Sequence, residues 1–552
     1  MSGLNLSVAV IGAGVCGLAA AIRVRELGIT QLTIYEKDED VGGTWLNNRY
    51  PGCGCDVESH LYSFSFAQNP NWSTAYAGRA EIHQYVRDVV ADKKLLPHIR
   101  FRTRVVSMSW SAAESRWRLK LAIRGDNGSV ESVDATANVV ICAMGPLSVP
   151  SIPANIDPAE FDGPVVHTNE WDESVQHKGK RVAVIGNAAS GVQVIGAIVD
   201  EVESLTVFQR TPNWVLPRWN PQHSAPFKWI FAHVPGAQRV WRTLLYLRRD
   251  LILHNVFRPS NFLAGRVSKL AANWMKSSVP PEMHDAIIPN YRFGCKRLIV
   301  SNDYLPAISS PKTTLITTPI QRLTKTGVLL TDGTTVPADL VVLATGFQIQ
   351  KPFTSTEVIG SDETTTLAEK WANTRDAYLG ITAHGYPNMY LMLGPYTGLA
   401  HSSVLTMAEL QAEYVTRILR RQMQTGTPAV AVTKAAEQAF VARCEKGMDG
   451  TAWKDGGCVS WYLDKPGGSP SALWPWTVFW YWWTTRKVVW SDYEPKMVLP
   501  LKMRLMMLVP TPRRAVKSVL LVLLAMAITR RFAVGKGAHD WITGLTRKLV
   551  GR

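Results

Sequence analysis

The sequence predicts an α/β protein built from two Rossmann-like, doubly wound dinucleotide-binding domains. Two stretches, 6–36 and 181–210, repeat one pattern of apolar strand, glycine-rich turn, helix and second strand, which is the pattern of a nucleotide-binding unit. Two further apolar strands end in Ala-x-Gly, at Gly145 and Gly346. A strand covered by helices on both faces is a continuous apolar run, as these are. The length of 552 residues is enough for two or three such domains.

The first unit carries a complete glycine fingerprint. Val8-Ala-Val-Ile leads into Gly12-Ala-Gly14-Val-Cys-Gly17, and a helix rich in alanine and leucine follows. The glycines permit a tight turn and a close approach of the backbone to a pyrophosphate at the N-terminus of the helix. Glu36 ends the second strand, at about the spacing expected of a carboxylate that accepts hydrogen bonds from ribose hydroxyls.

The second unit differs from this fingerprint at one position and at its end. Ala188 replaces the middle glycine and adds a methyl group where the backbone approaches a phosphate, although Ser190 and the adjacent amides can still bind it. No acid ends the second strand. Arg210 stands there instead, which favours the 2′-phosphate of NADP over the hydroxyl of NAD unless Arg210 is an ordinary surface charge. The predicted nucleotide contacts of this unit are Gly186, Ser190, Gly191, Arg210 and Thr211.

Between the two turns lies a motif that is more specific than either of them: Phe161-Asp-Gly163-Pro-Val-Val-His167-Thr-Asn-Glu-Trp171-Asp172. This pattern, in this place, resembles the signature of Baeyer–Villiger monooxygenases, and the resemblance extends over about residues 6–495. The resemblance implies FAD at the first turn and NADPH at the second. It also implies that oxygen and reduced flavin form a peroxyflavin, which converts a ketone to an ester or lactone, with sulfoxidation as a further activity.

The resemblance also assigns contacts to the flavin. Gly42-Gly-Thr44-Trp45, Tyr50-Pro-Gly and Asp56 are similar to a family segment that runs along the flavin. The flavin contacts that this implies are Thr44, Trp45, Asp56 and Tyr62. Packing in the core is the other role open to Trp45, and the two roles are compatible.

The catalytic residue comes from a second family segment, which Gly294-Cys-Lys296-Arg297 resembles. The resemblance implies that Arg297 is the catalytic cation and that Asp56 pairs with it and orients it. A fixed cation would stabilise an anionic peroxide and the tetrahedral adduct that follows, and arginine stays charged at any working pH. Lys296 is a second candidate for the 2′-phosphate. The alternative for Arg297 is a structural ion pair at a domain interface.

The remaining motif residues have weaker assignments. In the resembled family the signature lies on a connection between domains, so a role of His167 in coupling NADP binding to domain rotation is favoured over a general base. Trp171 is expected to pack there. A structural His401 is favoured over a catalytic one. Cys458-Val-Ser460-Trp461 resembles the family's mobile active-site loop, in which Trp461 would close over the nicotinamide.

The same resemblance implies the domain boundaries. In the family the two Ala-x-Gly strands mark where the chain enters and leaves the NADP domain. The FAD-binding domain would then comprise 1–146 and 347–495, with the NADP-binding domain, 147–346, inserted. A helical insert of about 220–285 interrupts the second unit, and 496–552 form a basic, amphipathic C-terminal extension.

Positive charge is concentrated in two segments of a chain whose net charge is +16. Residues 496–552 hold twelve basic side chains and one acid, and 228–276 hold nine and one. The apolar run 518–529 is too short for a bilayer span, which needs about 20 residues. The charge and apolar runs predict attachment of both segments to an anionic membrane surface and hence a lipophilic ketone substrate. The alternative is packing on protein or on another subunit. No recognised nucleic-acid motif accompanies the charge.

Seven cysteines without regular spacing predict no disulfide framework and a reducing, cytoplasmic compartment. The first strand begins almost at the start of the sequence, so we expect no signal peptide. No metal site is expected.

Two other enzyme classes share parts of this pattern. An N- or S-oxidising flavin monooxygenase has the same architecture, but Trp171-Asp172 at the end of the signature argues against it. A membrane-associated NAD(P)H:quinone oxidoreductase also pairs two nucleotide domains with an amphipathic tail, but it needs no arginine beside a peroxide. A redox sensor without turnover is disfavoured because the cofactor motifs and Arg297 are retained.

Overall fold

The computed structural model confirms the α/β class and describes most of the chain. The residues whose structure is described form one compact unit, and beyond Met497 the C-terminal extension lies outside them. The described ranges are 4–172, 174–258, 262–349, 353–372, 374–463 and 467–497.

The first glycine turn belongs to a five-stranded parallel sheet of order β19-β7-β1-β2-β3. Helix α1 (Val15–Glu26) follows the turn and packs along α11 (Val404–Thr425). Apolar side chains fill β1 and β7 completely, as expected for strands covered on both faces. The strands are β1 (Val8–Ile11), β2 (Leu32–Tyr35), β3 (Ile99–Arg100), β7 (Val139–Cys142) and β19 (Met389–Leu391).

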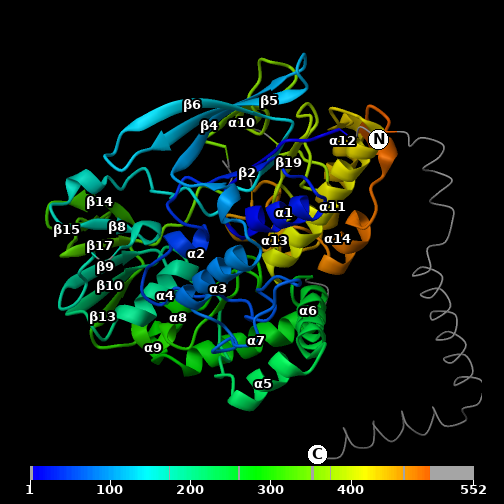
Figure 1. The fold of residues 1–552 in the computed structure, drawn as a ribbon. Coiled ribbons are helices and arrows are strands. Elements are labelled where there is room, and N and C mark those ends of the chain that lie inside the picture. The colour runs from blue at the N-terminus through cyan, green and yellow to red at the C-terminus, as the bar shows by residue number, and fades with distance from the viewer. Residues whose placement is uncertain are drawn as a thin grey trace, which may run out of the picture. The chain divides into compact units, whose positions relative to one another are not determined.

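The second glycine turn belongs to another five-stranded parallel sheet, of order β13-β10-β9-β17-β8. Helix α4 (Ala189–Ile198) follows the turn and packs against α9 (Tyr304–Ile308). In Figure 1 this sheet and these helices lie to the left of the first sheet. Its strands are β8 (Val165–His167), β9 (Arg181–Ile185), β10 (Ser204–Phe208), β13 (Thr313–Ile316) and β17 (Leu340–Leu343).

The two units repeat one packing detail that explains their first glycines. Gly12 has φ +103°, and a Cβ there would lie 2.7 Å from the carbonyl oxygen of Ala143, just after β7. Gly186 has φ +105°, and its Cβ would lie 2.5 Å from the carbonyl oxygen of Ala344, just after β17. The alanine of each Ala-x-Gly strand therefore touches the nucleotide turn beside it, and only glycine fits.

A mixed sheet, in which β18 runs parallel to β4, and an antiparallel sheet complete the two halves. The sheet β18-β4-β5-β6 lies at the top of Figure 1, and the sheet β14-β15-β16 extends the second half. The strands are β4 (Thr103–Ser111), β5 (Arg116–Arg124), β6 (Val130–Ala137), β18 (Glu357–Ile359), β14 (Ile320–Thr324), β15 (Gly327–Leu330) and β16 (Thr335–Pro337).

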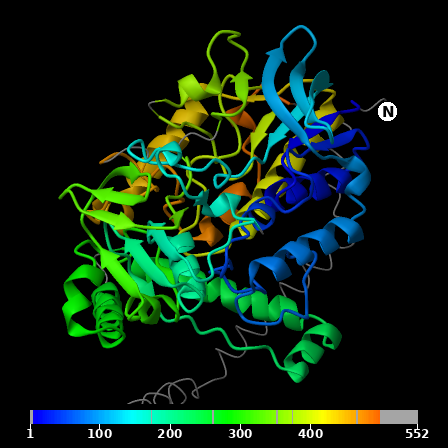
Figure 2. The same ribbon diagram turned by 90° about the vertical axis from the view of Figure 1, so that its left-hand side faces the viewer.

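Helices occupy the predicted insert, between β11 (Val215–Leu216) and β12 (Ile299–Val300). They run along the bottom edge in Figures 1 and 2, where they are coloured green. The helices are α5 (Ala225–His233), α6 (Ala237–Val256), α7 (Phe262–Ser277) and α8 (His284–Ile287).

The end of the described chain is helical and rich in tryptophan. Its helices are α12 (Lys434–Met448), α13 (Ala452–Asp455) and α14 (Val478–Thr485). Among the described residues, no helix has the length and apolar character needed to cross a membrane.

Candidate active site

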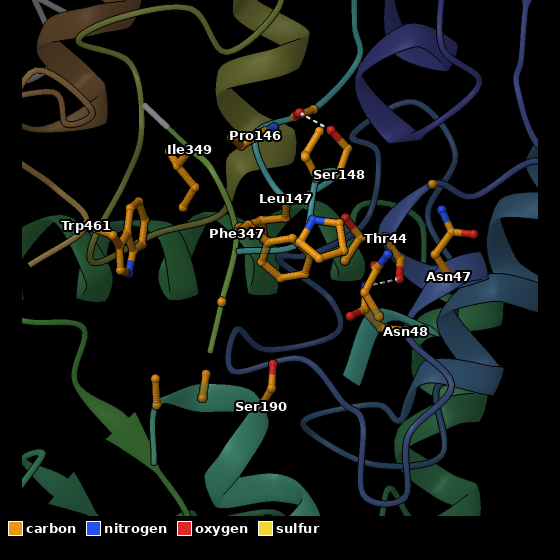
Figure 3. A pocket seen from close by; sticks show the side chains of 18 of the residues that line it. Thr44, Asn47, Asn48, Pro146, Leu147, Ser148, Ser190, Phe347, Ile349 and Trp461 are labelled. Carbon is orange, nitrogen blue, oxygen red and sulfur yellow. Dashed lines mark hydrogen bonds between the residues drawn. The ribbon is translucent and has the colours of Figure 1, made fainter. Parts of the chain in front are cut away.

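A cavity of about 1610 Å³ extends from the first glycine turn to the second. Figure 3 shows Trp461 and Ile349 on one side of it, Thr44 and Asn48 on the other, and Ser190 at the start of α4. The cavity brings together most of the side chains that the sequence predicts. The site residues predicted from the sequence that line this cavity are Gly12, Gly14, Glu36, Thr44, Trp45, Asp56, Tyr62, Gly186, Ser190, Arg210, Thr211, Lys296, Arg297 and Trp461.

Glu36 is buried at the end of β2 and holds the first turn. Its carboxylate accepts hydrogen bonds from the backbone N–H of Ala13 at 2.6 Å and of Asp38 at 3.0 Å. Burial raises the pKa of Glu36, and these two amides act against that shift. Gly17 lies under the turn, where an added Cβ would overlap the carbonyl oxygen of Gly12. A carboxylate and a glycine turn at a helix N-terminus suit the ribose and pyrophosphate of a dinucleotide.

Short helix α2 (Thr44–Asn47) places Trp45 and Tyr62 in contact with each other. The indole N–H of Trp45 donates to the hydroxyl of Tyr62 at 3.0 Å, and the rings meet edge to face with centroids 5.5 Å apart. Both side chains are buried, and both line the cavity. Trp45 therefore packs in the core and also lines the cavity.

Arg297 and Asp56 form an ion pair at the cavity. Both Nε and Nη2 of Arg297 donate to Oδ2 of Asp56, at 2.8 and 2.6 Å, and Nη1 donates to the carbonyl oxygens of Leu399 (3.3 Å) and Ala400 (2.9 Å). Burial alone would lower the pKa of Arg297, but Asp56 outweighs it and the pKa rises. Burial would likewise raise the pKa of Asp56, but Arg297 outweighs it and the pKa falls. Both partners therefore stay charged.

The second turn tolerates Ala188 because its backbone is ordinary there. Ala188 caps α4 with φ −75° and ψ −167°, an extended conformation that any residue adopts. Gly191 is the glycine that this turn requires, since an added Cβ would overlap the carbonyl oxygen of Gly186. The departure from the fingerprint leaves the turn intact.

Two cations converge beside the second turn. Burial lowers the pKa of Lys296, and the positive charge of Arg210 lowers it further. In the part of the chain that the structure describes, neither side chain has a carboxylate within 4.0 Å, although the ammonium of Lys296 lies 5.0 Å from the ring centroid of Tyr291. Adjacent cations without a carboxylate are the arrangement that suits a phosphate.

Phe161, Gly163, His167 and Trp171 of the signature do not line the cavity, whereas Asn169 and Glu170 of the same motif do. His167 ends β8 and is buried, so the pKa of its imidazole falls. Its Nε2 bonds the carbonyl oxygen of Gly346 at 3.1 Å, and its Nδ1 accepts from the N–H of Asn169 at 3.2 Å. Phe161 and Trp171 are buried, and a Cβ at Gly163 would lie 2.6 Å from the ring of Phe161. His167 thus connects the signature to the second Ala-x-Gly strand.

The cysteines correct one expectation from the sequence. Cys295 and Cys458 form a disulfide across 163 residues of sequence, whereas the irregular spacing predicted no framework; Cys16, Cys53, Cys55, Cys142 and Cys444 are free. The bond joins the segment of Lys296 and Arg297 to the loop that carries Trp461. Local spacing held no signal for it, because the pairing requires only that the two Cα atoms lie close, here 6.2 Å.

The insert contributes residues that motif analysis did not single out. Arg249 and Asp250 of α6 contact the loops on which Asp56 and His401 lie. The only signal in the sequence is that Asp250 is the one acid within the basic stretch 228–276. His401 is buried and bonded to Asp250 and is not among the residues lining the cavity.

A family model described as flavin-binding monooxygenase-like matches residues 5–439. The chain belongs to this family. A Baeyer–Villiger monooxygenase of Streptomyces coelicolor is 37% identical over 492 residues, which cover 89% of this chain and 92% of that protein. One of Pseudomonas aeruginosa is 35% identical over 473 residues, covering 85% and 88%.

Solved structures agree with this membership. A closed crystal structure of cyclohexanone monooxygenase matches with a TM-score of 0.78 and 27% identity, covering 89% of this chain and 98% of that one. An oxidised steroid monooxygenase bound to NADP matches with a TM-score of 0.76 and 28% identity, covering 88% and 98%. The predicted family and the two-domain dinucleotide fold are confirmed, and the relatives do not favour a quinone oxidoreductase.

The disulfide leads to a prediction about the loop. Cys458→Ser should release the loop 456–463 from the Arg297 segment, so a protease should cleave beside Trp461 faster than in the unchanged protein. Peptide mapping without reductant should find Cys295 linked to Cys458. Cys53→Ser, which removes a free thiol, serves as the control and should leave the cleavage rate unchanged. If the protease cleaves the unchanged protein, Cys458→Ser and Cys53→Ser at equal rates, the disulfide does not restrain the loop.

Proposed function

We propose that this protein is a Baeyer–Villiger monooxygenase that uses FAD and NADPH. The overall reaction takes a ketone, O₂, NADPH and a proton to an ester or lactone, water and NADP⁺. Membership of the flavin-binding monooxygenase-like family, and relatives named as Baeyer–Villiger monooxygenases at 35–37% identity, support it. A similar solved structure, that of OTEMO, is a complex with FAD and NADP. The observation that carries the proposal is the Arg297–Asp56 pair in a cavity between two nucleotide turns.

The two halves of the chain would divide the cofactors between them. Residues 1–146 and 347–495 would bind FAD, with its pyrophosphate at the turn of Gly12 and its ribose at Glu36. Residues 147–346 would bind NADPH at the turn of Gly186. Bound FAD would supply the oxygen-activating chemistry once NADPH has reduced it. The glycines without room for a Cβ and the anchored carboxylate fit these groups.

The chain's own part in the reaction is electrostatic. Arg297 keeps 22% of its side chain exposed, facing the cavity that it lines. Asp56 and the carbonyls of Leu399 and Ala400 fix the guanidinium, so it needs no reorganisation when negative charge develops nearby. Its raised pKa keeps the guanidinium protonated, and it therefore stabilises an oxyanion without transferring a proton.

The proposed role of Arg297 can be tested by its removal. Arg297→Ala should lower ester formation by about 100-fold or more, the usual cost of losing an oxyanion-stabilising donor. NADPH should still be consumed, with hydrogen peroxide as the product. The measurement is the ester, hydrogen peroxide and NADPH balance on a ketone panel, with Arg297→Lys as the partial rescue that keeps the charge. Ester formation at the unchanged rate would refute the proposed function.

Coenzyme preference tests Arg210. Losing its charge-assisted hydrogen bonds to a 2′-phosphate costs about 1.5–3 kcal/mol, or roughly 10- to 100-fold. Arg210→Ala should therefore raise the KM for NADPH by this factor and leave the KM for NADH unchanged. Arg322→Ala removes a half-exposed arginine of β14 that is not in the cavity lining and is the control. Equal losses with both coenzymes would show that Arg210 does not read the 2′-phosphate.

The second part of the proposal is attachment to an anionic membrane, and one described surface supports it. Four aromatic side chains of α14 and two leucines of α6 form what we term the aromatic face. Asp250 of α6 accepts the N–H of Val478 and of Phe479 at 3.1 Å each, which joins the two helices, and α14 lies directly above α6 in Figure 1. Its residues, 42–53% exposed, are Leu244, Leu247, Phe479, Trp480, Trp482 and Trp483.

The charges around the aromatic face match anionic lipid. The exposed basic residues of α6 and α7 include Arg239, Arg266, Lys269 and Lys276, and the one acid of 228–276, Asp250, is buried. Arg486 stacks on Trp483 at the end of α14. Tryptophan with flanking cations is the composition of membrane interfaces. A lipid surface on the cytoplasmic side would supply the lipophilic ketone; the part of the extension beyond Met497 lies outside the described residues.

Vesicle binding tests the aromatic face. The full chain should sediment with phosphatidylglycerol vesicles and not with phosphatidylcholine ones. Leu244→Ser should weaken binding by about 10-fold or more, the value of burying one leucine, whereas Leu96→Ser, with a nearly equal exposure of 55% against 53%, should not. Equal binding by both variants, or a concentration-dependent dimer that Leu244→Ser abolishes, would exclude lipid as the partner of this face.

A further inference from the structure

Two consecutive residues of α6 reach the two loops that hold Arg297. One loop contains Asp56, the ion-pair partner of Arg297, and the other contains Leu399 and Ala400, its carbonyl partners. Arg249 contacts the first loop and Asp250 contacts the residue that follows Ala400. The insert helix therefore touches both supports of the candidate catalytic cation.

Arg249 fixes the loop of Asp56 through three hydrogen bonds. Its Nη2 donates to the backbone carbonyl of Asp56 at 3.3 Å, and its Nε and Nη2 donate to Oε2 of Glu58 at 2.9 and 2.6 Å. Glu58 is 5% exposed, and 16% of the side chain of Arg249 is exposed. A mostly buried ion pair with several hydrogen bonds is costly to break, because it leaves one charge unpaired.

Asp250 fixes the second loop and the start of α14. Its Oδ1 lies 3.2 Å from Nε2 of His401 and accepts the N–H of Val478, while Oδ2 accepts the N–H of Phe479. Both Asp250 and His401 are buried. Burial lowers the pKa of His401, and Asp250 acts against it. A carboxylate at a helix N-terminus is also favoured by the helix dipole.

We propose that Arg249 and Asp250 are positioning residues for Arg297, through which the insert helix sets the direction of its guanidinium in the cavity. The inference rests on the proposed function of Arg297. Neither residue is among those lining the cavity, so neither would touch substrate or cofactor. Each acts through a neighbour: Arg249 through Asp56, and Asp250 through His401 and the adjoining carbonyl of Ala400.

Loss of Arg249 also changes the charge around Asp56. Burial raises the pKa of Asp56, and Arg297 and then Arg249 lower it to below the ordinary value of 3.8. The other titratable groups around the pair include Glu58, which pairs with Arg248 and Arg249, and His401, which is bonded to Asp250. The rest are thiols and phenols whose pKa burial raises, so they are neutral where Asp56 titrates: Tyr50, Cys55, Tyr62 and Tyr462.

The sign of the pH effect follows from this charge balance. The Asp56–Arg297 pair persists above the folded pKa of Asp56 and is lost as the pH falls through it. Without the cation of Arg249 that pKa rises. The acid limb of the oxygenation rate should therefore move to higher pH in a variant that lacks the Arg249 charge.

The experiment compares Arg249→Met and Arg249→Lys with Arg248→Ala in the FAD-loaded full chain. Arg248 is the neighbouring arginine on α6; it also bonds Glu58 but has no bond to Asp56, and 53% of its side chain is exposed. For Arg249→Met we expect a several-fold rise in hydrogen peroxide per ester formed and a raised acid limb, with FAD content and anaerobic reduction by NADPH unchanged. Arg249→Lys should recover part of the coupling, and Arg248→Ala should behave as the unchanged protein.

A second variant covers the case in which Arg249→Met does not fold. Asp250→Asn keeps an acceptor for the α14 amides and weakens the bond to His401, so the peroxide fraction should rise without a shift of the acid limb. If these variants lose only thermal stability or FAD, and the peroxide fraction per bound FAD is unchanged, the residues are merely structural and the inference fails. Arg297→Ala is measured in parallel: if it forms ester normally, the proposed function fails instead.

Discussion

The Arg297–Asp56 ion pair is the interaction on which the candidate site depends. It connects residues 241 positions apart, one from the segment after the first nucleotide unit and one from the segment after the insert. Burial opposes both charges, since it lowers the pKa of Arg297 and raises that of Asp56, and each partner counteracts that effect on the other. The loop after β19 and the insert helix also bond to this pair, which lies in the cavity between the two nucleotide turns.

Sequence motifs predicted the parts of the site that depend on contacts between residues close in sequence. The turns at Gly12 and Gly186 and the carboxylate of Glu36 follow from strand, turn and helix within 31 residues of sequence or fewer, because the physical constraint acts between near neighbours. Contacts between distant segments carry no such pattern. The Cys295–Cys458 bond was missed for this reason, and so were the contacts of Arg249 with Asp56 and Glu58.

The count of charges in the sequence did not distinguish between the basic residues of the insert, whereas the structure separates them into buried and exposed ones. Arg242 and Arg249 point inward, where Arg242 bonds the carbonyl of Ser63 and Arg249 pairs with Glu58, while Arg239 and Arg266 are exposed. Part of the positive charge of 228–276 is therefore used in buried ion pairs and hydrogen bonds, and part of it lies on the surface. One helix, α6, directs Arg249 toward the candidate site and Leu244 and Leu247 to the outside.

The disulfide has a mechanical consequence for the loop that carries Trp461. The loop 456–463 cannot lift as a whole, because Cys458 is bonded to Cys295, one residue from Lys296 and two from Arg297. Trp461 lies three residues beyond that fixed point. Any movement of its indole is therefore a rotation about a point beside the candidate catalytic cation, and the short stretch of chain between that point and Trp461 limits how much of the cavity the ring can reach.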